Sequence, residues 1–273
     1  MQLDLHDPGI SKTLAIVGKR ELEHRVILHR ELRPGMTVWD LGANIGYYAL
    51  MEAQIVGPHG RVYAVEPLPS NCDLLTRNVE MNGRQDRVEI FQMAISNQNG
   101  TADFHISELS NTSTFHPRSY RSNQPVKSLS GRTMAVQTMD VPTFVSGKRP
   151  INLVRMDIEG HEVEVFQSIR AAVAATDFSA SILFETHFPR YDDQHHNMRE
   201  QLQGLFDVGY YVKWLATSDE RKASLRSRGY EPEQVIPTDG VVRGLYRDVD
   251  RQLALELVCD RGGVRTVYLE RRA

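Results

Sequence analysis

The sequence predicts a doubly wound α/β fold, in which a mostly parallel sheet is covered by helices on both faces. Short apolar runs at residues 36–41, 61–66 and 150–157 are each followed by apolar residues at helical spacing, with glycine or proline between the two. Such an alternation is typical of parallel βαβ units with right-handed crossovers. Each run also carries a carboxylate at its end, and 273 residues suffice for one large domain of this class.

The remaining elements follow from the same spacing rules. Residues 11–32 predict one or two amphipathic helices, which Arg33-Pro34-Gly35 ends. Segments 241–246, 253–258 and 264–269 are short and alternating, so we expect strands that close the sheet, at least partly antiparallel. The other predicted strands are 87–93, 102–106, 134–138, 180–185 and 210–215, and the other predicted helices are 45–56, one between Pro69 and Asn82, 162–175 and 197–207.

A long polar segment, roughly residues 97–135, interrupts the alternation and is rich in Ser, Asn, Thr and Arg. It is either a floppy surface insertion or a loop over the substrate, because long loops in compact domains are often functional. We therefore predict one domain over residues 1–273, with an N-terminal helical extension at 1–34 and a substrate loop or lid insertion at 105–133.

Charge and composition exclude several classes of partner. With 32 basic and 35 acidic side chains, the chain offers no electrostatic case for nucleic acid or an anionic membrane as its main partner. Cys72 and Cys259 lack metal-site spacing and are expected to be thiols of a cytoplasmic protein. No signal peptide and no membrane-spanning apolar run is evident, and a homo-oligomer is left open. A solvated basic helix face is expected at Arg221, Lys222, Arg226 and Arg228.

Four carboxylates sit where strands are predicted to end: Asp40, Glu66, Asp157 and Glu185. Ligands of open α/β sheets bind at the carboxyl ends of the strands, near the point where the strand order reverses. A strand that only stabilises the sheet has no need of an acid there. The joint placement of the four acids therefore predicts a binding site at this edge.

The first of these acids precedes a glycine turn, Asp40-Leu41-Gly42-Ala43-Asn44-Ile45-Gly46. Gly42 permits a backbone conformation closed to other residues and a close approach of ligand, and Gly46 lets the following helix pack on the strand. The turn lacks the third glycine of dinucleotide folds and the Gly-Lys-Ser/Thr of a P-loop, which disfavours a nicotinamide oxidoreductase. An acid before the glycines repels a pyrophosphate and suits a sulfonium or ammonium group, and S-adenosylmethionine (SAM) carries both.

Glu66 ends the next strand, where an acid can accept two hydrogen bonds from ribose hydroxyls. Residues 93–96 follow the third strand and can frame an adenine with backbone groups and small side chains.

Residues 40–48 resemble the SAM-binding turn of class I methyltransferases, and the segments 65–67 and 157–162 resemble the FkbM family in particular. The usual family run is Lys-x-Asp-x-Glu-Gly-x-Glu, in which Arg155 replaces the lysine here. The resemblance covers roughly residues 35–190. Further residues that fit the family are Asn71, Asn78, Asn82, Met139, Asp140, Glu185, Thr186 and His187.

The resemblance implies a Rossmann-like sheet of seven strands with a terminal antiparallel strand, SAM as cofactor, and methyl transfer to a hydroxyl of a small molecule such as a sugar, glycoside or polyketide-like natural product. N-methylation of an amino sugar or peptide is the alternative, and a non-catalytic SAM- or nucleoside-binding partner protein is the alternative from another class. The expected cofactor-binding residues are Asp40, Gly42, Ala43, Asn44, Gly46, Tyr47, Glu66, Pro67, Asn71, Ala94, Ser96 and Asp157.

Methyl transfer to a hydroxyl needs an aligned acceptor and a group that removes its proton. The candidate catalytic residues are Asp157, Glu159, His161, Glu185 and His187. Histidine is a suitable base near neutral pH, although His161 can instead lie on an exposed helical turn. Asp157, Glu185 and His187 can also gather a divalent cation, which is left open. The pair His195-His196 is expected in a solvated loop rather than at a metal.

Overall fold

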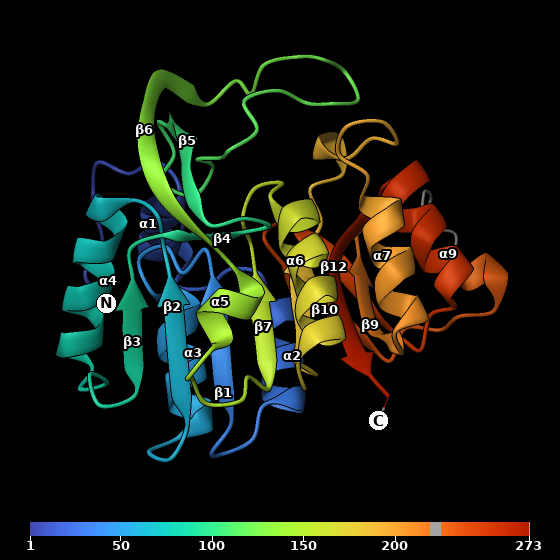
Figure 1. Ribbon diagram of the computed structural model, residues 1–273, viewed down its shortest axis with the longest axis horizontal. Helices are drawn as coiled ribbons and strands as arrows, with labels where there is room; N and C mark the ends of the chain where they lie inside the picture. Colours follow the sequence, from blue (N-terminus) through green and yellow to red (C-terminus); the bar gives the residue numbers. More distant parts are fainter. Residues whose placement is uncertain (219–224, 273) are drawn as a thin grey trace.

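The computed structural model describes residues 1–218 and 225–272. Within these residues a nine-stranded sheet forms the centre of the molecule (Figure 1). In order across the sheet its strands are β10 (Gln234–Thr238), β11 (Val241–Arg247), β9 (Tyr210–Thr217), β12 (Val264–Arg271), β8 (Ser181–Glu185), β7 (Leu153–Met156), β1 (Thr37–Leu41), β2 (Arg61–Val65) and β3 (Val88–Phe91).

The five strands from β3 to β8 run parallel, and β12 lies antiparallel between β8 and β9. This confirms the doubly wound, mostly parallel class with a terminal antiparallel strand. The sheet is two strands wider than the seven expected, because β10 and β11 extend its edge beyond β9 as an antiparallel pair.

Helices cover each face of the sheet and form two separate cores. Strand β1 is buried throughout, and its neighbouring residues Val38 and Trp39 belong to opposite cores, as the alternation of side chains along a strand requires. The core that contains Trp39 includes α5 (Val141–Val145), α6 (Glu162–Ala175), α7 (Met198–Asp207) and α9 (Arg251–Leu255). The core that contains Val38 includes α2 (Leu22–Glu31), α3 (Tyr47–Val56) and α4 (Pro69–Met81).

A second, three-stranded sheet stands above the carboxyl ends of β1, β2 and β3 (Figure 1). It consists of β4 (Ala94–Ser96), β5 (Gly100–Ser107) and β6 (Leu129–Asp140), with β6 in the middle. The strands predicted at 102–106 and 134–138 are the central parts of β5 and β6, which pair from Gly100↔Thr138 to Ser107↔Leu129. Much of the polar segment is therefore sheet, and the loop between β5 and β6 projects from it.

The C-terminal region contains the main correction to the predicted elements. Residues 253–258 are not a strand but form α9 and the first turn of a π-helix, η3 (Glu256–Arg261). Asp250 starts this helix by accepting hydrogen bonds from the backbone of Gln252 and Leu253. The periodicity of a short apolar run does not distinguish a buried strand from a buried helix. Here the cap at Asp250 favours the helix.

Strand β10 was not expected, because Pro237 and the polar residues around it weaken the strand pattern. Of the expected basic helix face, Arg221 and Lys222 lie outside the described residues. The other two arginines fall in a 3-10 helix, η2 (Arg226–Arg228). Cys72 and Cys259 are buried free thiols.

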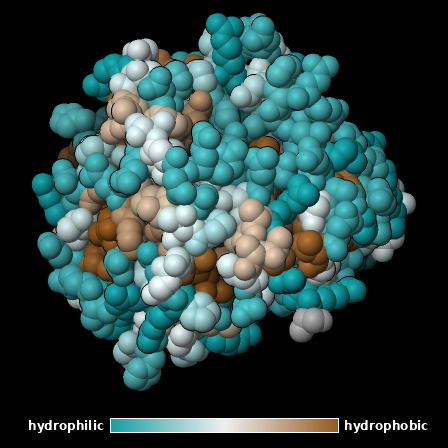
Figure 2. Space-filling view, viewed as in Figure 1, coloured by the Kyte–Doolittle hydropathy of each residue, from teal (hydrophilic) through white to brown (hydrophobic). Residues whose placement is uncertain are grey.

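The two N-terminal helices are present as α1 (Ile10–Val17) and α2. Helix α1 packs Ile10 and Leu14 on Ile45 of the glycine turn. None of the helices in the described ranges is long and apolar enough to cross a membrane. On the face shown in Figure 2 most of the surface is hydrophilic, and apolar residues gather around β3 and α5.

Candidate active site

The glycine turn between β1 and α3 has a backbone that few residues can adopt. Gly42 has a φ of +78°, and a Cβ at this position would lie 2.2 Å from the backbone oxygen of Asp157. Asn44 is left-handed at φ +50°, a conformation that asparagine tolerates, and its Oδ1 accepts from the backbone of Ile45 at 2.8 Å. A glycine is therefore required at position 42 mainly because the chain after β7 passes so close. The conformation of the turn is fixed by the protein itself, without a ligand.

Glu66 follows β2 and its carboxylate is held by three donors. The backbone N–H groups of Asn44 and Leu68 each donate to it at 2.9 Å, and the amide of Asn71 donates at 3.2 Å. Burial raises the pKa of Glu66 to about 7 in spite of these donors. A buried carboxylate with fixed orientation beside a cavity is suited to accept hydrogen bonds from a pair of hydroxyls.

A cavity, with about 570 Å³ of empty space that is partly open to solvent, lies next to Glu66 and runs to the residues that follow β7. Its polar lining includes Glu66, Asp157 and Ser110, and its apolar lining includes Phe104 and Phe115. The last three of these residues, Ser110, Phe104 and Phe115, belong to β5 or to the loop after it. Part of the polar segment is thus a wall of the cavity, whereas the sequence left open whether this segment is a surface insertion or a loop over the site.

A second, smaller hollow of about 350 Å³ shares Gly42, Asn44, Asn111 and Asp157 with the first. The two hollows therefore adjoin at the glycine turn and at Asp157. The smaller one is also lined by Ile10, Arg20, Glu21, Ala43, Tyr47, Tyr48 and Arg155. Sequence reasoning missed Arg20 and Glu21, which are brought to the site by the packing of the N-terminal helices.

Most of the predicted cofactor residues line one hollow or the other, and four do not. Gly46 packs against Leu75, where a Cβ would lie 2.5 Å from Cδ1. Asn71 orients Glu66, and Ser96 lies 3.0 Å from the ring of His161. The residues that line a hollow are Gly42, Ala43, Asn44, Tyr47, Glu66, Pro67, Ala94 and Asp157.

Asp40 is the fourth predicted cofactor residue that lines neither hollow, and its position differs most from the expected contact with the cofactor. It is fully buried beneath the turn, where its Oδ1 accepts from Arg155 at 2.9 Å. Burial raises the pKa of Asp40, and the guanidinium opposes that rise. Arg155 also lies 3.3 Å from Asp157 and stacks on the ring of Tyr48. Asp40 therefore supports the site through Arg155, because a buried charge needs a partner of opposite sign.

Four of the five predicted catalytic side chains come together after β7 and β8. His187 Nε2 lies 3.8 Å from Asp157, 3.6 Å from Glu159 and 3.5 Å from Glu185, while its Nδ1 lies 2.9 Å from Glu162. Burial alone would lower the pKa of His187, but the carboxylates of Glu162 and Glu159 raise it well above its usual range. His187 is therefore an imidazolium within an acidic cluster.

The same cluster contains the three residues that the sequence singled out for a divalent cation. Ligand atoms of Asp157, Glu185 and His187 all lie within 4.8 Å of one another. Burial raises the pKa of Glu185 well above its usual range. Burial is also the main cause of the raised pKa of Asp157. One Oε atom of Glu185 is buried without a hydrogen-bond partner among the described residues.

His161 lies apart from this cluster and is buried, not exposed on a helical turn. Its Nδ1 is 3.2 Å from His116, and its ring is tilted against Phe115 with centroids 4.5 Å apart. Burial lowers the pKa of His161 to about 4, so the ring is neutral near pH 7. His161 lines the larger cavity beside Phe115, whereas Asp157 stands where the two hollows adjoin.

The sheet order and the glycine turn define the architecture of a class I SAM-dependent methyltransferase. The model of the methyltransferase FkbM domain matches residues 40–231, which is more than half of the chain, and the chain therefore belongs to that family. The family and the fold imply SAM as cofactor. The residues fit this group, since Glu66 is an oriented acceptor for a ribose and Gly42, which has no side chain, lines the same cavity.

Two relatives illustrate the similarity. Hexuronic acid methyltransferase AglP of Haloferax volcanii is 29% identical over 161 residues, which are 59% of this chain and 60% of that protein. 2-O-methyltransferase NoeI of Sinorhizobium fredii is 27% identical over 180 residues, which are 61% of this chain and 72% of that protein. The chain thus matches less than two thirds of the length of the first of these relatives.

Two solved structures that resemble this chain share less sequence identity with it than these relatives do. The methyltransferase FkbM of Methylobacillus flagellatus has a TM-score of 0.41 at 12% identity, over 78% of this chain and 43% of that chain. A SAM-dependent O-methyltransferase of Thermotoga maritima has a TM-score of 0.46 at 12% identity, over 96% of this chain and 70% of that chain.

Proposed function

We propose that this protein is a SAM-dependent methyltransferase that acts on a hydroxyl group of a small, sugar-like acceptor. The observation that carries the proposal is the position of Asp157. It stands between a cavity with an oriented Glu66 and a charged hollow, and it belongs to a cluster of acids around His187. The names of the two relatives, a hexuronic acid methyltransferase and a 2-O-methyltransferase, support a sugar hydroxyl as acceptor.

The two hollows divide the cofactor between them. Glu66 accepts hydrogen bonds from the ribose hydroxyls, and the apolar wall at Phe104 and Phe115 covers the adenine. The smaller hollow holds the amino-acid end, for which Arg20 and Glu21 offer opposite charges. When bound, SAM supplies an electrophilic methyl group on its sulfonium.

The acid cluster holds the acceptor and takes its proton. Asp157 lines both hollows, and burial raises the pKa of its carboxyl above the usual range, which makes the carboxylate a stronger base than a free one. The protonated His187 donates from Nδ1 to Glu162, and its charge offsets the repulsion among Asp157, Glu159 and Glu185. The loop between β5 and β6, within the predicted lid at 105–133, closes the site from above and excludes water.

Calorimetry with SAM, S-adenosylhomocysteine and NAD tests the cofactor, and a panel of acceptors with radiolabelled methyl tests the reaction. We expect both sulfur compounds to bind and NAD to give no heat. We expect label on hydroxyls of hexoses or hexuronic acids, located by mass spectrometry. Binding of NAD without a response to SAM would overturn the cofactor assignment, and label on the nitrogen of an amino sugar would overturn the hydroxyl acceptor.

A further inference from the structure

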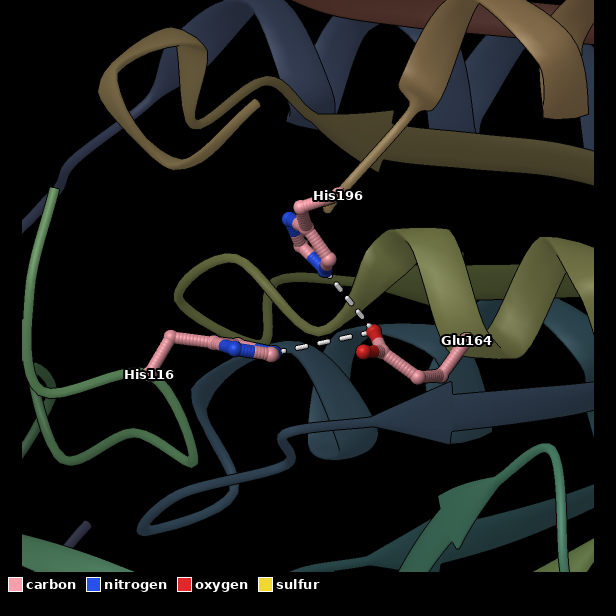
Figure 3. A group of neighbouring side chains, drawn as sticks. All are labelled: His116, Glu164 and His196. Carbon is pink, nitrogen blue, oxygen red and sulfur yellow. Dashed lines mark hydrogen bonds and ion pairs between the residues drawn. The ribbon is translucent and has the colours of Figure 1, made fainter. Parts of the chain in front are cut away.

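A second group of histidine and carboxylate side chains lies outside the cluster around His187. Figure 3 shows His116, Glu164 and His196 converging from the β5–β6 loop, from the first turn of α6 and from the segment before α7. Oε2 of Glu164 lies 3.0 Å from His196 Nε2 and 3.6 Å from His116 Nε2. Each histidine is more than nine-tenths buried.

These spacings match those between the ligands of a tetrahedral metal. Bonds of about 2.0–2.1 Å to a central ion place neighbouring ligand atoms roughly 3.3 Å apart. His161 stands beside the set as a fourth donor, since its Nδ1 is 3.2 Å from His116 and 3.4 Å from Glu164. Three imidazole rings therefore each direct a nitrogen toward one carboxylate oxygen. This is more hydrogen-bond donors than that oxygen needs.

The opposite nitrogen of each ring already has an oxygen partner. His196 Nδ1 lies 2.6 Å from the carbonyl of Arg190, which can only accept, so Nδ1 carries the proton and Nε2 faces Glu164. His116 Nδ1 lies 3.2 Å from the Tyr120 hydroxyl, and His161 Nε2 lies 3.0 Å from that of Ser96. Such outer partners fix the ring orientation of metal-bound histidines.

The backbone that carries two of the ligands is also held in place. Arg190 donates to the carbonyls of His116 and Arg118 at 2.8 and 3.1 Å. Asp192 accepts from the backbone N–H of His195 at 2.7 Å and of His196 at 2.8 Å. The sequence reading of His195-His196 as a solvated loop is therefore wrong for His196, because this turn directs its ring inward.

We propose that His116, Glu164 and His196 bind one divalent transition-metal ion, with His161 as the neighbouring nitrogen donor. Zn²⁺ fits best, because neutral imidazoles and a single carboxylate suit it better than Mg²⁺ or Ca²⁺, which take oxygen ligands. The ion joins three segments that are distant in the sequence. Since Ser110 and Phe115 of the same loop line the cavity, the metal holds the loop over the cofactor.

Metal binding is measured on protein without an affinity tag, after removal of metals with a chelator. Calorimetry should show one Zn²⁺ per chain, and Co²⁺ should give visible absorption typical of four-coordinate nitrogen and oxygen ligands. His116→Asn and His196→Asn should each weaken Zn²⁺ binding at least a hundredfold. His195→Asn is the matched control, because its side chain is 70% exposed, and it should bind as the wild type does.

A second control variant, His187→Asn, distinguishes this site from the cluster around His187. This variant should retain wild-type Zn²⁺ affinity. Loss of binding in His187→Asn with full binding in His116→Asn and His196→Asn would overturn the proposal and place the ion on Asp157 and Glu185. Absence of stoichiometric binding by the stripped wild type would overturn it as well.

Proteolysis of the wild type gives a readout that needs no variant to fold. Arg118, Arg121 and Lys127 are exposed in the β5–β6 loop and offer trypsin three cleavage sites. Zn²⁺ should slow cleavage at these sites at least tenfold in the stripped protein. Unchanged cleavage with Zn²⁺ bound would show that the ion does not hold this loop, which would overturn the site.

Discussion

Asp40 and Glu66 end neighbouring strands, yet their surroundings give them different roles. Glu66 receives N–H donors on the cavity wall, whereas Asp40 meets a guanidinium beneath the turn. The sequence correctly predicted an acid at each strand end. It could not predict where each carboxylate would point, because this depends on Arg155 of a strand more than a hundred residues away.

Glu66→Gln should weaken binding of S-adenosylhomocysteine about tenfold to a hundredfold, the loss expected for hydrogen bonds to a charged acceptor. The wild-type affinity should fall as the pH is lowered from 8 to 6. A carboxyl with a pKa of about 7 is mostly ionised above that pH and mostly protonated below it, and only the ionised form has all its acceptor sites free. Calorimetry across this range measures the effect. Glu66→Gln should show a flat profile, and an equally steep one would contradict the role of Glu66.

Gly42→Ala should destabilise the protein far more than Gly18→Ala. Both glycines have positive φ, of +78° and +72°, but only at Gly42 would the new Cβ meet a backbone oxygen, that of Asp157 at 2.2 Å. Gly18 ends α1 with open space around it, so its substitution should cost only about 1–2 kcal/mol of unfolding free energy for the left-handed conformation. Urea unfolding compares the two variants. Equal losses would mean that the chain after β7 moves away freely.

His187→Asn should lower kcat on the true acceptor by about 10- to 100-fold, the loss expected for a hydrogen bond between charged groups, while leaving the affinity for S-adenosylhomocysteine within a few-fold of the wild type. His187 contacts Asp157, Glu159 and Glu185 but lines neither hollow. Steady-state kinetics and calorimetry separate the two effects. A matched fall in cofactor affinity would instead make His187 a residue of the cofactor site.

At the scale of elements, the polar insertion differs most from what its composition suggested. Its serines and asparagines are typical of a solvated loop, but β5 and β6 pair over most of their length and the loop between them returns to the site. Ser110 accepts from the side chain of Asn44 at 3.1 Å and donates to Asp7 at 2.8 Å. The loop thus ties the glycine turn to the N-terminal segment.

Replacing residues 109–127 by a short turn should leave the fold intact and weaken binding of S-adenosylhomocysteine at least tenfold. Strands β5 and β6 remain paired at Ser107↔Leu129, whereas Asn111 and Phe115 are lost from the cavity wall. Circular dichroism checks the fold and calorimetry the affinity. Wild-type affinity in the shortened protein would show that the loop is not part of the cofactor site.

At the scale of the whole molecule, the buried pair of Asp40 and Arg155 joins the neighbouring strands β1 and β7 within the parallel part of the sheet. Asp40→Asn should cost about 3–5 kcal/mol of unfolding free energy, because it leaves a buried guanidinium with one partner fewer. The double variant with Arg155→Met should recover part of this loss. Urea unfolding of the two single variants and the double one tests the coupling, and purely additive losses would contradict it.

The class of fold, the glycine turn and the acids at the strand ends could be predicted from the sequence, because apolar periodicity, glycine conformation and strand polarity are local properties. The correct prediction of α6 at 162–175 shows how far such local rules extend. Only the tertiary structure turned Asp40 away from the cavity, brought Arg20 and Glu21 to the smaller hollow, and gathered His116, Glu164 and His196. These contacts join segments that are far apart in the chain, and no local pattern encodes the distance between them.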